Sequence, residues 1–104
     1  MKLNKPNKNK ELDIEALTHA AECLKALAHA HRLQIVQLLL SGAQLSVGEI
    51  AEYCDLNQPT TSAHLRLMQR CGFLESERDG RTVFYSVCEP HLEDIMNCIQ
   101  SRFG

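Results

Sequence analysis

The sequence lacks any run of the roughly 20 apolar residues that a membrane-spanning helix needs. Residues 1–10 hold four lysines but no apolar segment, so we expect no signal peptide. These two absences predict a cytoplasmic protein with no membrane partner. In that reducing compartment, cysteines stay reduced, bind metal or sense redox state. The cysteine count is five, an odd number, so the cysteines cannot all pair within one chain.

The chain has no excess of positive charge, since 11 Lys and Arg face 13 Asp and Glu and give a net charge of −2. This balance excludes a broadly basic nucleic-acid coat but leaves room for a local patch. Residues 59–85 hold four arginines against three acids, so positive charge gathers there.

Signs of enzyme chemistry are also missing. The sequence has no glycine-rich phosphate loop, no paired carboxylates placed for a cleft and no Ser/His/Asp arrangement on a credible scaffold. We therefore expect a protein that is not an enzyme.

What is present is the composition of one globular domain, with 44% hydrophobic and 23% charged residues in 104. Residues 1–12 are polar, Lys-rich and without periodicity, which predicts a flexible basic N-terminal arm. Residues 13–104 form the predicted domain. The arm is either a solvated tail or a source of salt-dependent DNA affinity.

Apolar residues at steps of three and four predict a helix that begins at Asp13 and a second, mostly buried helix that ends near Gly42. Ser46 and Glu49 have capping-box spacing and predict a short third helix. Pro59 lies in the first turn of a fourth helix, which ends at Gly72.

Two predicted strands, Phe73–Glu77 and Arg81–Val87, flank the turn signal Asp79-Gly80, and a last helix follows Pro90. The fold class is therefore mainly α with a small β-hairpin, in the order α-α-α-α-β-β-α. This order is typical of a winged helix-turn-helix.

Such a unit places its second helix in the major groove of DNA and its hairpin on the backbone or minor groove. Glutamine can pair with adenine, Ser and Thr can bond bases or phosphates, and Arg suits phosphate. Thr61 is also a candidate for the inward face. The residues predicted to contact DNA are Gln58, Thr60, Thr61, Ser62, Ala63, His64, Arg66, Arg70, Arg78 and Arg81.

Five segments together resemble ArsR/SmtB-type bacterial repressors over about residues 14 to 103. Leu24–Val36 resembles the first two helices of these repressors, and Leu45–Ala51 the third helix. Gln58–Met68 resembles the recognition helix, Cys71–Leu74 the entry to the strand after it, and Asp79–Tyr85 the wing. The resemblance implies a homodimeric winged-helix repressor. It also implies that the first and last helices form the dimer interface and that a ligand, usually a metal ion, lowers affinity for the operator.

A dimer is favoured by the apolar stripes of the two terminal helices as well, because a small domain needs a surface on which to bury them. Two recognition helices would then lie roughly 34 Å apart, so the operator should be an inverted repeat. The predicted dimer-interface residues are Leu17, Leu24, Leu92, Ile95, Met96, Ile99 and Phe103.

The ligand sites of the family are incomplete in this chain. Glu89 and His91 match the early pair of the last-helix site, but the late pair falls on Arg102 and beyond Gly104. Cys71 matches one of two recognition-helix cysteines, while Leu67 occupies the other position. The third helix has no cysteine pair, and residues 36 and 37 of the second helix lack the cysteine of the redox type.

The remaining sensing candidates are Cys23, Cys88, His91 and Cys98, with His19 as a further ligand one helical turn from Cys23. Four N and S ligands would suit Zn(II) or another thiophilic metal or metalloid. Oxidation or reaction with a sulfur species is the alternative, and simple packing of buried thiols is a third.

Other residues have plainer interpretations. Cys54 and Cys71 are expected to pack, His29 and His31 to cap a helix or lie at the surface, and Arg32 to contact a phosphate or carboxylate. An alternative function of another class is a protein-interaction module that keeps the winged-helix shape without binding DNA.

Overall fold

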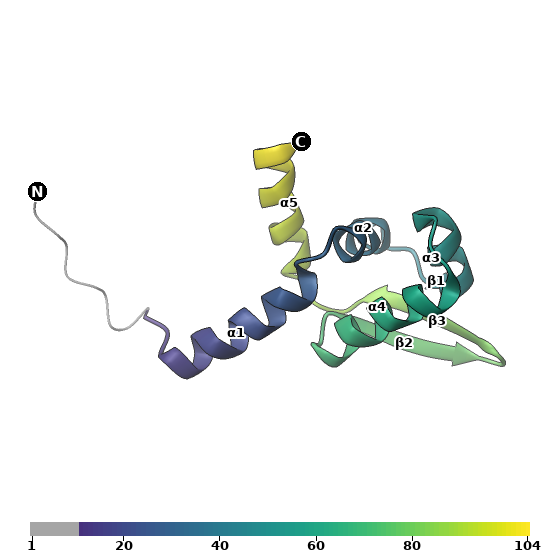
Figure 1. The fold of residues 1–104 in the computed structure, drawn as a ribbon, viewed down its shortest axis with the longest axis horizontal. Coiled ribbons are helices and arrows are strands. Elements are labelled where there is room, and N and C mark those ends of the chain that lie inside the picture. Colours follow the sequence, from purple (N-terminus) through teal and green to yellow (C-terminus); the bar gives the residue numbers. More distant parts are fainter. Residues whose placement is uncertain (1–10) are drawn as a thin grey trace, which may run out of the picture.

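The computed structural model describes residues 11–104, so nearly all of the predicted arm, residues 1–10, lies outside the described residues. Figure 1 shows the arrangement of the elements. In chain order they are α1 (Ile14–Leu27), α2 (Ala30–Leu39), β1 (Leu45–Ser46), α3 (Val47–Cys54), α4 (Gln58–Arg70), β2 (Leu74–Asp79), β3 (Thr82–Val87) and α5 (Leu92–Phe103). This order confirms the predicted mainly helical winged helix-turn-helix.

Side-chain caps fix where α1, α3 and α4 begin. Asp13 accepts a hydrogen bond from the Ala16 amide at 2.8 Å, which starts α1. The predicted capping box is present, since Ser46 and Glu49 each accept a bond from the other's backbone amide. The cap of α4 is Asn57, which accepts from the Thr60 amide at 2.8 Å.

The sheet has the strand order β1-β3-β2 and is antiparallel throughout. The prediction of two strands missed β1, because two residues are too few to show an alternating pattern. The predicted turn was also displaced by one residue. Asp79 pairs with Thr82, so the loop is Gly80-Arg81, with Gly80 at φ 64°. A glycine with positive φ in the first loop position suits the twist of a two-residue hairpin.

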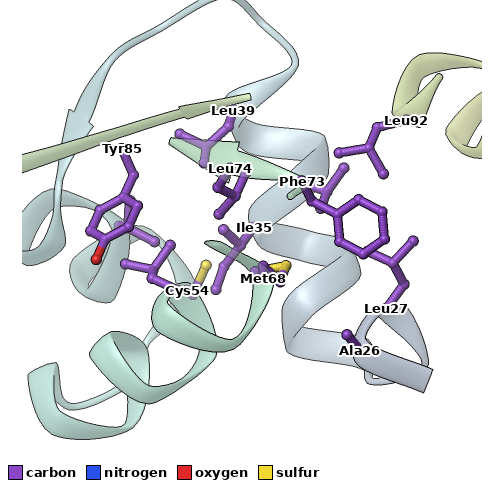
Figure 2. Close-up of a cluster of buried hydrophobic side chains, with 13 residues drawn as sticks. Ala26, Leu27, Ile35, Leu39, Cys54, Met68, Phe73, Leu74, Tyr85 and Leu92 are labelled. Atoms are coloured by element: carbon purple, nitrogen blue, oxygen red, sulfur yellow. The ribbon is translucent and has the colours of Figure 1, made fainter. Parts of the chain in front are cut away.

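The core lies around α2, the helix predicted to be mostly buried. Ile35, Val36 and Leu39 of α2 are at most 1% exposed. They pack with α3, α4 and the sheet, as Figure 2 shows for Cys54, Met68, Leu74 and Tyr85 among others. The body of the winged helix is therefore a single core onto which α3 and α4 are fixed.

The terminal helices α1 and α5 extend away from this body (Figure 1). Only Ala26 and Leu27 of α1 are buried, and only Leu92 of α5. Leu92 was predicted to lie at a dimer interface, but it is 1% exposed and packs against Leu27 and Phe73 in the protomer core (Figure 2). That prediction was wrong, because the first residue of the α5 stripe already lies where the helix meets the body.

Among residues 11–104, no helix is both long enough and apolar enough to cross a membrane.

Candidate nucleic-acid interface

Helices α3 and α4 meet at a tight turn and present α4 on the outside of the body (Figure 1). Asp55 in this turn has φ 54°, a left-handed conformation that closes the short connection. Residues predicted to contact DNA that remain accessible on α4 are Gln58, Thr60, Ser62, Ala63, Arg66 and Arg70. Of these, Ser62 alone is half-buried and the rest are exposed.

Two residues predicted to contact DNA lie on the wrong face of α4. Thr61 is 0% exposed, and its hydroxyl donates to the Asn57 carbonyl at 2.9 Å. His64 is 8% exposed and accepts a hydrogen bond from Arg32. Thr61 and His64 lie on the same inward face of α4 as Leu65 and Met68. Their polar groups therefore form hydrogen bonds within the protein.

A groove of about 400 Å³ separates the start of α4 from the wing formed by β2 and β3. Three of the residues predicted to contact DNA, Gln58, Ser62 and Arg81, line this groove. Sequence reasoning missed the wing residue Thr82 and the α3 residues at the groove wall. Gly48 of α3 lies at this wall, where an added Cβ would come into contact with Gln58 Nε2 at 3.4 Å. Helix α4 and the wing thus line the same groove.

The arginines of this face are exposed and have no acidic partner among the described residues. Arg66, Arg70, Arg78 and Arg81 are all exposed. Within the described part of the chain the one ion pair joins His91 to Glu89, so none of the four arginines is paired with a described acid. Glu77 on the wing instead accepts a hydrogen bond from Gln44 at 3.2 Å. Unpaired guanidinium groups are well suited to phosphate oxygens.

Arg32 has a different role from the predicted contact with a phosphate or carboxylate. Its Nε donates to His64 Nδ1 at 3.0 Å, and its Nη1 donates to the Ala26 carbonyl at 3.3 Å. It therefore ties α2 to α4 and to the end of α1.

The sensing candidates are not brought together within one protomer. Across residues 11–104, no group of three His, Cys, Asp or Glu side chains is placed to hold a metal ion, so a protomer by itself does not fit a Zn(II) site. Cys23 on α1 is half-buried, whereas Cys98 on α5, Cys88 and His91 are exposed, as is His19.

Cys88 is a poor candidate for a reactive thiol or a metal ligand. Partial burial, followed by the charges of Glu75 and Glu89, raises the pKa of its thiol, and its Sγ donates to the Gly72 carbonyl. His91 is held by Glu89, which raises the pKa of the imidazole and favours its protonated form over the neutral form that binds metal. Cys54 is buried, as predicted, and burial raises the pKa of its thiol.

Comparison with known proteins agrees with this geometry. The sequence profile described as "Bacterial regulatory protein, arsR family" matches residues 29–76, which run from the start of α2 into β2. The solution structure of a homodimeric winged helix-turn-helix DNA-binding domain from Mycobacterium bovis, a possible ArsR-family transcriptional regulator, superposes with a TM-score of 0.73. The two are 30% identical, over 88% of this chain and 85% of that one. The chain belongs to the ArsR family.

Two further relatives of this ArsR-family chain carry functional names. The "Probable mercury resistance operon repressor" of Streptomyces lividans is 36% identical over 76 residues, which are 73% of this chain and 60% of that protein. The "Transcriptional activator HlyU" of Vibrio cholerae is 34% identical over 84 residues, 81% of this chain and 77% of that protein. The ArsR-family chain is thus a DNA-binding transcription regulator, and the predictions of its family, and that it is not an enzyme, are confirmed.

Proposed function

We propose that this ArsR-family chain is a dimeric repressor that reads an inverted-repeat operator with two copies of α4. The observation that carries the proposal is the accessible polar face of α4 beside a wing whose arginines have no acidic partner among the described residues. Bases would be addressed by Gln58, Thr60, Ser62 and Ala63, and phosphates by Arg66, Arg70, Arg78 and Arg81.

Support for the dimer comes from the apolar surface of the terminal helices. Leu17 and Leu24 on α1 are 47% and 53% exposed, and Phe103 on α5 is 76% exposed. Ile99 adds to this surface and is half-buried, and Ile95 and Met96 are half-buried beside it, where they also pack against the protomer core. A self-complementary two-fold contact would bury both helices, and the Mycobacterium bovis relative is a homodimer. Residues 13–104 would then serve both DNA binding and dimerisation.

Repression is supported by the Streptomyces lividans relative, whose name is that of a repressor, while the Vibrio cholerae relative carries the name of an activator. A dimer seated on an inverted repeat within a promoter blocks access of polymerase to that promoter. The proposed repressor therefore lowers transcription from a template that carries its operator. The Lys-rich residues 1–12 would add salt-dependent affinity.

The test is binding to a labelled duplex of the DNA upstream of its own gene, followed by fluorescence anisotropy between 50 and 200 mM salt. We expect specific binding that weakens steeply with salt, by about 10³-fold over this range if six or more phosphates are contacted. Transcription in vitro from the same template should fall. Absence of specific binding would favour the protein-interaction module, and a rise in transcription would contradict repression.

We infer that the inducer acts across the dimer interface on Cys23 and Cys98, and that it is a thiophilic metal or metalloid ion. The two thiols lie on α1 and α5, the helices with open apolar faces, and His19 stands one turn from Cys23. Both protomers would have to contribute ligands, since one protomer gathers no group of three among its described residues. The exposed Cys98 thiol favours oxidation or a sulfur species as the alternative.

The double substitution Cys23→Ser and Cys98→Ser should leave operator affinity intact and abolish its response to the inducer. Anisotropy titrations with Zn(II), Cd(II), As(III) and polysulfide would each be run on this variant and on the matched control Cys71→Ser. We expect a metal to weaken operator binding by about 10-fold or more in the wild type and the control, but not in the double variant. A response to polysulfide alone would favour the redox alternative, and an unchanged response in the double variant would exclude these thiols as the sensor.

A further inference from the structure

A cluster of three histidines and one arginine joins the start of α2 to the recognition helix α4. His29, His31 and Arg32 come from α2 and its cap, and His64 comes from the inward face of α4. The ring centroid of His64 lies 4.6 Å from that of His29 and 6.5 Å from that of His31, and His29 and His31 are 5.7 Å apart. His64 is 8% exposed, His31 and Arg32 are half-buried and His29 is exposed, so the cluster runs from the surface to the inward face of α4.

The hydrogen bonds define which nitrogen of His64 carries the proton. Arg32 Nε–H points at His64 Nδ1 at 3.0 Å, and a guanidinium group has donors only and stays charged. Nδ1 must therefore be the bare acceptor nitrogen of a neutral imidazole. Since Arg32 also donates to the Ala26 carbonyl, this one side chain connects the last turn of α1, the first turn of α2 and the middle of α4. His29 is fixed in a similar way, because its Nδ1 accepts from the His31 amide and caps α2.

The surroundings of His64 all oppose a positive charge on its ring. Burial has the largest effect and lowers the pKa of His64, followed by the charges of His29, Arg32 and His31. These three groups are the ionisable neighbours that act on the ring, all from the start of α2, and no carboxylate is among them. A proton on Nδ1 would remove the acceptor of Arg32 and set two cations against each other.

We propose that Arg32 positions the recognition helix through the neutral imidazole of His64, and that protonation of His64 releases α4 from α2 and weakens DNA binding. Arg32 and His64 are positioning residues in this proposal, which rests on the proposed function because it needs an operator to read. DNA itself would be contacted by the opposite, exposed face of α4, which carries Thr60, Ala63 and Arg66.

The pH window follows from the direction of the pKa. The pKa of His64 in the folded protein lies below the ordinary value of 6.5, so folding favours the neutral form. Under the proposal, DNA binding favours the same form. The link is fully present above pH 6.5 and is lost as the pH falls below the folded pKa. If only the neutral form binds well, affinity should fall about 10-fold per pH unit below that value.

The decisive variant is His64→Asn, whose side-chain oxygen can replace Nδ1 as acceptor for Arg32 but does not titrate. Operator affinity would be measured from pH 8.0 to 5.5 at constant ionic strength, with His31→Asn as the matched control that leaves the Arg32 bond intact. At pH 8.0 we expect H64N to bind the operator within about threefold of the wild type. Between pH 8.0 and 5.5, H64N should lose less operator affinity than either the wild type or the His31→Asn control. Equal acid losses in H64N and the wild type would overturn the proposal.

A second variant separates positioning from direct phosphate contact. Arg32→Met removes both hydrogen bonds and should weaken operator binding about 10-fold at pH 8.0. The slope of the logarithm of the binding constant against the logarithm of the salt concentration should stay unchanged. A slope reduced by about 0.9 would mean that Arg32 contacts a phosphate, and would overturn its assignment as a positioning residue. Thermal unfolding checks that R32M is folded. If R32M does not fold, Arg32→Lys is used in its place, because lysine keeps the positive charge but lacks the planar guanidinium group that makes both hydrogen bonds.

The result also distinguishes this proposal from the function on which it rests. If the wild type fails to bind its upstream DNA at pH 8.0, the proposed function fails. The hydrogen bond between Arg32 and His64 is then tested by NMR titration of the His64 ring. A neutral Nε2–H tautomer that protonates below pH 6.5 in the wild type, and at a higher pH in Arg32→Met than in the wild type, supports the link. An unchanged titration in that variant contradicts it.

Discussion

Replacing Ala63 with glutamate will reduce operator affinity at least about 100-fold without loss of the fold. Ala63 is exposed in the middle of α4, between the residues proposed to read bases, and it has no contact with the core. Glutamate is a good helix former, so the helix itself is little affected. The new carboxylate would face the phosphates and base edges of the major groove, where like charges repel strongly and the desolvated carboxylate has no partner.

The measurement is anisotropy with the upstream duplex, with far-ultraviolet circular dichroism as the check on folding. Ala63→Gln is the matched control, because glutamine has the size of glutamate without its charge. We expect A63Q to lose about 10-fold or less, so that the difference between the two variants reports charge rather than bulk. Wild-type affinity in A63E would show that this face of α4 does not enter the groove.

His64 shows why the outward face of α4 could be predicted only in part. The helical period of the buried residues Leu65 and Met68 also places Thr61 and His64 on the inward face, whereas the polar side chain of His64 predicts a contact with DNA. Its partner Arg32 lies 32 residues away in the sequence. A buried polar residue satisfied by a distant partner leaves no local signal, since period and polarity then point in opposite directions.

Leu92 illustrates a second limit of the same kind. Its spacing to Ile95, Met96 and Ile99 predicts an amphipathic helix correctly, but a stripe that packs inside the protomer and one that packs on a partner have the same period. Only the placement of α5 shows that Leu92 is buried in the protomer core and that Ile95 and Met96 pack beside it, while Phe103 at the end of the helix is exposed (Figure 2 shows Leu92). By contrast, the caps of α1 and α3 were predictable because they depend on residues no more than three apart.

Leu24→Glu should convert the dimer to a monomer and lower operator affinity about 100-fold. Leu24 is 53% exposed in the protomer, so a charge there leaves the core undisturbed, whereas burying that charge in a two-fold interface would be strongly unfavourable. A monomer loses the second reading helix, which the dimer holds at a high effective concentration over its half-site. Light scattering after size exclusion gives the oligomeric state, and anisotropy gives the affinity.

Tyr53→Glu is the matched control for this interface. Tyr53 is 64% exposed and apolar in its ring, but it lies on α3, at the far side of the body from α1 in Figure 1. Y53E should remain dimeric, which would show that the effect belongs to the terminal helices rather than to any exposed apolar residue. A monomeric L24E that kept wild-type affinity for an inverted repeat would mean that one α4 suffices. In that case, spacing of half-sites could not carry operator specificity, and an inducer at the α1 and α5 thiols would have no interface through which to act.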